Sequence, residues 1–60
     1  MKIQKRVTVD LGPDTEIVVE LREYDKSNYQ VRMDEVLVLG LTDYNAAVKL
    51  FNNIVMGLIQ

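Results

Sequence analysis

The sequence contains no cysteine, no histidine and no tryptophan, and it has one proline and three glycines in 60 residues. Without cysteine no disulfide can form, and without cysteine or histidine the usual zinc, haem and iron–sulfur ligand sets are excluded. Catalysis by a histidine base or a thiolate nucleophile is excluded as well. We therefore expect no enzymatic activity, no catalytic residues, no bound metal and no cofactor.

Long apolar segments are also missing. The longest uninterrupted apolar run is residues 36–39, far short of the roughly 18 residues that a membrane span needs. The charged start of the chain does not resemble a signal peptide. Together with the absence of cysteine, this favours a cytoplasmic protein without a membrane partner.

The size of the chain predicts a dependence on association. Residues 1–60 make one small domain, of which 48% is hydrophobic and 27% charged, as in globular proteins. A domain of this size buries only about 60% of its unfolded surface. Small domains compensate through disulfides, metals or association. Because disulfides are impossible here and a metal is disfavoured without histidine or cysteine, we expect a homo-oligomer, in particular a dimer, or a complex with another protein.

Period-two alternation predicts three strands at residues 3–11, 16–24 and 29–39. Gly12-Pro13-Asp14 separates the first two and a polar turn at residues 25–28 precedes the third. We expect the alternating apolar residues to face the helix described next: Ile3, Val7, Val9, Ile17, Val19, Leu21, Val31 and Met33. The third segment ends in Val36-Leu37-Val38-Leu39, apolar on both faces, which is typical of a strand covered on both sides.

The remaining segment predicts a helix from Tyr44 to about residue 59. Thr42 or Asp43 is the expected N-cap, and apolar residues recur at helical spacing from Tyr44 to Leu58. The predicted fold class is α+β: a three-stranded antiparallel meander followed by one C-terminal helix packed on the sheet, in a dimer.

Surplus apolar surface gives the leading functional hypothesis. Val36 and Val38 are expected on the outer sheet face, and Met56, Leu58 and Ile59 at the end of the helix. These five residues are the predicted partner or dimer interface. The polar helix face is a second candidate contact surface, with amides suited to hydrogen bonding; it contains Asn45, Lys49, Asn52, Asn53, Met56 and Gln60. The corresponding function is that of a small regulatory or interaction protein, such as a phage-encoded accessory protein or inhibitor.

Basic residues of the outer sheet face give an alternative. Arg6, Arg22 and Arg32 fall on this face and could contact DNA, but Glu20 lies among them, so cross-strand ion pairs are the simpler interpretation. The strand order, Leu39-Gly40-Leu41-Thr42 and Asn45-Ala46-Ala47 resemble plant AP2-type and phage integrase arm-binding domains. That resemblance implies DNA binding through the sheet. However, where those families use basic and aromatic residues, this chain mostly has Glu20, Val18 and Val36.

Acidic residues give a third alternative, in which the chain imitates DNA and blocks a DNA-handling enzyme. Nine acidic residues against seven basic ones leave a net charge of −2, which supports mimicry only weakly. The carboxylates do not match a calcium loop and are expected to be ordinary solvated charges.

Overall fold

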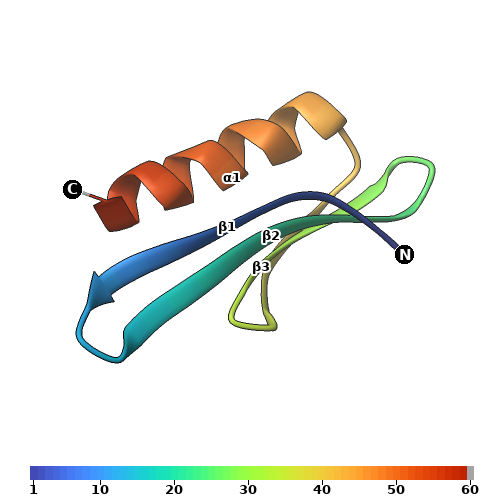
Figure 1. Cartoon of the computed structure of the whole chain (residues 1–60). Coiled ribbons are helices and arrows are strands. Elements are labelled where there is room, and N and C mark those ends of the chain that lie inside the picture. Colours follow the sequence, from blue (N-terminus) through green and yellow to red (C-terminus); the bar gives the residue numbers. More distant parts are fainter. Residues whose placement is uncertain (60) are drawn as a thin grey trace.

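The computed structural model describes residues 1–59, which form a four-stranded antiparallel sheet and one helix (Figure 1). The elements are β1 (Lys2–Gly12), β2 (Thr15–Asp25), β3 (Asn28–Met33), β4 (Val36–Leu41) and α1 (Tyr44–Ile59). The α+β class and the C-terminal helix on an antiparallel sheet are confirmed. Because the strands lie side by side in chain order, β1 and β4 are the two edges of the sheet.

The predicted third strand at residues 29–39 is wrong, because this segment folds back on itself as the hairpin β3–β4. Asp34 and Glu35 make the turn, with positive φ angles of 50° and 69°. The backbone N–H of Asp34 donates to the Val18 carbonyl at 2.8 Å, and the Val18 N–H donates to Asp34 Oδ1 at 2.9 Å. These bonds to β2 hold the turn in place without the glycine that usually marks such turns.

Within one copy, residues 36–39 are not covered on both faces, and their cover by a partner stays a prediction. In a hairpin, these residues form the short outer strand β4, which pairs with β3 alone. A strand that is apolar on both faces is typically a central strand, but here this pattern occurs in an edge strand.

Register confirms most of the predicted helix-facing residues. Val7 lies opposite Val19, and Leu21 lies opposite Val31. Ile3 is the exception: a shift in the pairing between Ile3 and Lys5 places it opposite Arg22. An inserted residue reverses the side-chain alternation beyond it, so Ile3 belongs to the outer face.

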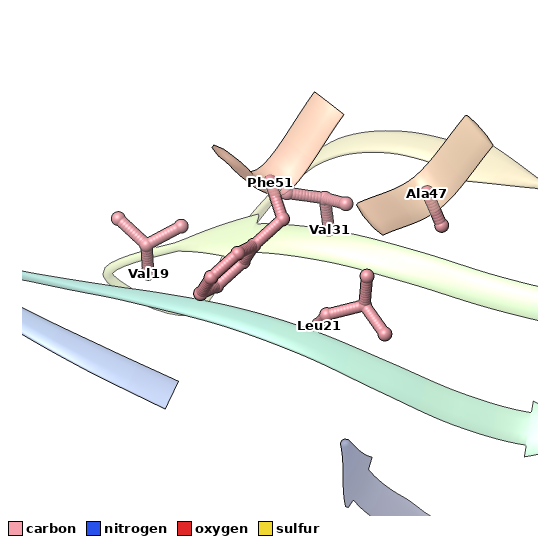
Figure 2. Close-up of a cluster of buried hydrophobic side chains, with 5 residues drawn as sticks. All are labelled: Val19, Leu21, Val31, Ala47 and Phe51. Atoms are coloured by element: carbon pink, nitrogen blue, oxygen red, sulfur yellow. The ribbon is translucent and has the colours of Figure 1, made fainter. Parts of the chain in front are cut away.

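The core lies between α1 and the centre of the sheet. Figure 2 shows Ala47 and Phe51 of α1 directed towards Val19 and Leu21 of β2 and Val31 of β3; all five are buried. Asp43 is the N-cap, because its Oδ2 accepts a hydrogen bond from the Ala46 N–H at 3.0 Å. The helix packs on β1, β2 and β3 and contacts β4 least, which leaves that edge largely uncovered.

Candidate interaction surface

The β4 edge is the most exposed apolar strand of the molecule. The exposed fractions of its first four residues are 67% for Val36, 48% for Leu37, 42% for Val38 and 50% for Leu39. On the side away from β3, the strand has no neighbour among residues 1–59. Apolar side chains and unpaired backbone groups therefore occur together along this edge.

Register assigns the β4 side chains to the two faces of the sheet. Val36 lies opposite Met33 and Leu39 opposite Val31, so both are on the face that carries α1. Leu37 lies opposite Arg32 on the outer face. The pairing shifts between Val31 and Arg32, which leaves Val38 as the additional residue of a bulge. The prediction that Val36 lies on the outer face is therefore wrong, because the two-residue turn at Asp34 and Glu35 pairs Val36 directly with Met33 of the helix face.

The other edge of the sheet has a different character. Along β1, the side chains of Lys2, Lys5, Arg6 and Asp10 are exposed, and the pairing with β2 is irregular at two places. Charged side chains and bulges are the means by which proteins prevent further strands from adding to an edge. The β4 edge contains one bulge and no charged residue, so it is much less protected.

The predicted interface residues of the helix do not all belong to one exposed patch. Met56 is 60% and Ile59 is 68% exposed, whereas Leu58 is half-buried and packs against the core. The C-terminal end of α1 lies above the turn that joins β1 and β2 (Figure 1). On the polar face Asn45, Lys49, Asn52 and Asn53 are all exposed. Gln60 lies outside the described residues.

The outer face of the sheet is organised around Glu20, which is 3% exposed. Arg6 Nε donates to Glu20 Oε2 at 2.7 Å, and Arg22 Nε donates to Glu20 Oε1 at 2.8 Å. The predicted cross-strand ion pairing with Glu20 is thus confirmed for Arg6. Arg32 also lies opposite Glu20, but it donates to Gln30 Oε1 and the Glu35 carbonyl instead.

Arg22 connects this cluster to the β3–β4 turn. Its Nη2 donates to both carboxylate oxygens of Glu35, at 2.9 and 3.0 Å, and its Nη1 donates to the Tyr24 hydroxyl at 3.3 Å. The side chain of Arg22 is only 11% exposed, whereas that of Arg6 is 56% exposed. All three arginines are thus held by partners within the chain, and Arg22 offers little surface to a phosphate.

The two arginines determine the ionisation of Glu20. Burial alone would raise the pKa of its carboxyl group, but the hydrogen bonds and charges of Arg6 and Arg22 outweigh burial and lower that pKa below 4.5. The hydrogen bond and charge of Arg22 likewise lower the pKa of Tyr24. Glu20 therefore stays a carboxylate that Arg6 and Arg22 hold on the outer face of the sheet.

Two other kinds of site receive no support within residues 1–59. No three acidic side chains gather there in a way that could hold a metal ion. In the same part of the chain, no helix combines the length and the apolar character needed to cross a membrane. Comparisons with protein-family models, curated proteins and solved structures found no match.

Proposed function

We propose that this chain is a small non-enzymatic interaction protein, which acts by binding another protein chain along the exposed edge of β4. The observation that carries the proposal is the exposure of residues 36–39, each at least 42% accessible on a strand that is paired on one side only. A regulatory or inhibitory role is the corresponding activity, because such a protein works by occupying its partner.

The chemistry of the β4 edge defines the kind of partner. Every second backbone N–H and C=O of an edge strand points away from the sheet, and a new strand satisfies these groups by pairing with it. Apolar residues on both faces, such as Leu37 and Leu39, then pack against side chains of the added strand. Covering these apolar side chains removes them from water, which favours binding. A partner with an apolar β-strand is therefore the best fit.

A comparison of matched variants tests this proposal. The tagged chain is incubated with an extract of its native host, and retained proteins are identified by mass spectrometry. Val36→Lys places a charge on the β4 edge, whereas Ile59→Lys places the same charge at an equally exposed position, 68% against 67%, at the end of α1. We expect Val36→Lys to lose a retained protein, which is either the chain itself or another protein, while Ile59→Lys retains it. Identical retention by the wild type and Val36→Lys would contradict the proposal.

A further inference from the structure

We infer that the strand that covers β4 belongs to a second copy of this chain, so that two copies join edge to edge around a two-fold axis and form one continuous eight-stranded sheet. This inference rests on the proposed function, because it names the partner of the same edge. The two-fold axis is perpendicular to the sheet, so both helices lie on one face of the combined sheet.

Charge favours self-pairing of β4 over the other arrangement available to identical copies. Val36–Leu41 contains no charged residue, so antiparallel pairing with itself brings no like charges together. Pairing β4 with the β1 edge of another copy would place apolar side chains against Lys5, Arg6 and Asp10. It would also leave a free edge at each end and build an open filament, whereas β4–β4 pairing closes.

Side-chain direction restricts the register of the pairing. Residues that lie opposite each other in antiparallel strands point to the same face. Within one copy, Val36 and Leu41 are on the helix face, while Leu37 and Gly40 are on the outer face. A register that pairs Val36 with Leu41 and Leu37 with Gly40 satisfies this rule and uses the whole strand. Sliding one strand by a single residue would pair Val36 with Gly40, on opposite faces.

The packing of a single copy explains why a second copy adds stability. Among residues 1–59, only six apolar residues are buried in one copy: Val9, Val19, Leu21, Val31, Ala47 and Phe51. In the paired sheet, Val36 and Leu39 of both copies come together on the helix face, between the two helices. The dimer thus gains a second apolar cluster along the edge that α1 covers least.

Oligomeric state of the purified chain is the first test. By size-exclusion chromatography with light scattering at tens of micromolar, we expect a dimer for the wild type and for Ile59→Lys. Val36→Lys should weaken dimerisation by at least about 100-fold, because two-fold symmetry buries two lysines. Circular dichroism checks that Val36→Lys still folds, as expected for a position 67% exposed. A monomeric wild type overturns the inference, and the retention experiment then decides separately whether β4 binds another protein. A dimer broken by Ile59→Lys but not by Val36→Lys also overturns it.

Cysteine cross-linking tests the register, because the natural chain has no cysteine that could interfere. Leu37→Cys and Gly40→Cys, carrying different tags, are mixed and oxidised. A Cβ at Gly40 would meet only the Tyr29 carbonyl oxygen at 3.9 Å, an ordinary contact. Opposed residues lie about 5 Å apart, within disulfide range, whereas two copies of residue 37 would be about 8 Å apart, because the bulge leaves two pairing positions between residues 37 and 40. We expect the mixed disulfide and little cross-linking of either variant alone. Failure of the mixed pair, or equal cross-linking by Leu37→Cys alone, contradicts the inferred pairing.

Discussion

At the scale of a single residue, Glu20 is a charged side chain that is buried although it lies on the outer face of the sheet. The carboxylate lies in the outer face of the sheet at 3% exposure and accepts hydrogen bonds from Arg6 and Arg22. Removing one partner of a buried ion pair strongly destabilises a protein, because the other charge then stays buried without an opposite charge beside it. Without the Glu20 carboxylate, Arg22 would still pair with Glu35, and Arg6 is half-exposed to water. The loss of stability is therefore smaller than for an ion pair in a closed core.

Replacement of this carboxylate by an amide should destabilise the protein in a pH-dependent way. We expect Glu20→Gln to lower the free energy of unfolding at pH 7 by about 2 kcal/mol, the value of hydrogen bonds to a charged group. Because the folded-state pKa of Glu20 is lowered, its stabilisation is complete above the unfolded value near 4.5. It is lost as the pH falls through the folded-state pKa. The difference between wild type and variant, measured by urea denaturation, should therefore shrink below about pH 4.5.

Glu16→Gln is the matched control for this prediction, since Glu16 is exposed on the same strand. It should change stability by less than about 0.5 kcal/mol. A constant difference between the wild type and Glu20→Gln from pH 7 to pH 2 would show that the charge of Glu20 does not contribute.

The β3–β4 hairpin is the element that sequence patterns did not reveal. Asp34 and Glu35 both have left-handed backbone conformations, which cost about 1–2 kcal/mol for residues other than glycine. Asp34 is held by Val18 of β2, and the Glu35 carboxylate is held by Arg22. Contacts with distant strands thus fix a turn that local preferences disfavour.

Glycine at the second turn position should relieve this strain. Glu35→Gly and Glu35→Ala both remove the carboxylate, whose pair with Arg22 is worth less than about 1 kcal/mol because Glu35 is 76% exposed. Only glycine adopts the positive φ without steric cost. We therefore expect Glu35→Gly to be more stable than Glu35→Ala by about 1 kcal/mol in thermal or urea unfolding. An alanine variant as stable as the glycine variant would indicate that the turn is not strained.

Elements with regular patterns could be predicted from the sequence, and those with insertions could not. The helix from Tyr44, its Asp43 cap and the β1–β2 hairpin follow from helical spacing, capping chemistry and alternation. The turn at Asp34 lacks glycine. The bulges between Ile3 and Lys5 and at Val38 correspond to no recognisable residue pattern in the sequence. Two adjacent acids that interrupt the alternation were the only available signal for the fourth strand.

At the scale of the whole molecule, charge and apolar surface are separated. The arginines and carboxylates of the outer face neutralise each other around Glu20, while apolar residues are left exposed along the β4 edge. The sequence correctly indicated apolar exposure at Val36 and Val38. It could not show that they form an edge, because edge position depends on strand order and not on composition.

The engagement of the arginines predicts weak contact with nucleic acid. Arg22 and Arg32 donate to partners within the chain, and the net charge is −2. We therefore expect no salt-dependent binding of labelled duplex DNA in fluorescence anisotropy at low salt and high protein concentration. Salt-dependent binding that is lost on replacement of Arg6 by glutamine would contradict this and restore the alternative of a sheet-face DNA binder.

Hydrogen exchange at the backbone amides of β4 tests the central claim most directly, because it reports whether this edge is paired in solution. If a second copy covers β4, exchange of amides within residues 36–41 should slow as protein concentration rises. This protection should disappear in Val36→Lys and persist in Ile59→Lys. If the amides that point away from β3 exchange rapidly at every concentration, and Val36→Lys exchanges like the wild type, β4 is not a site of self-association.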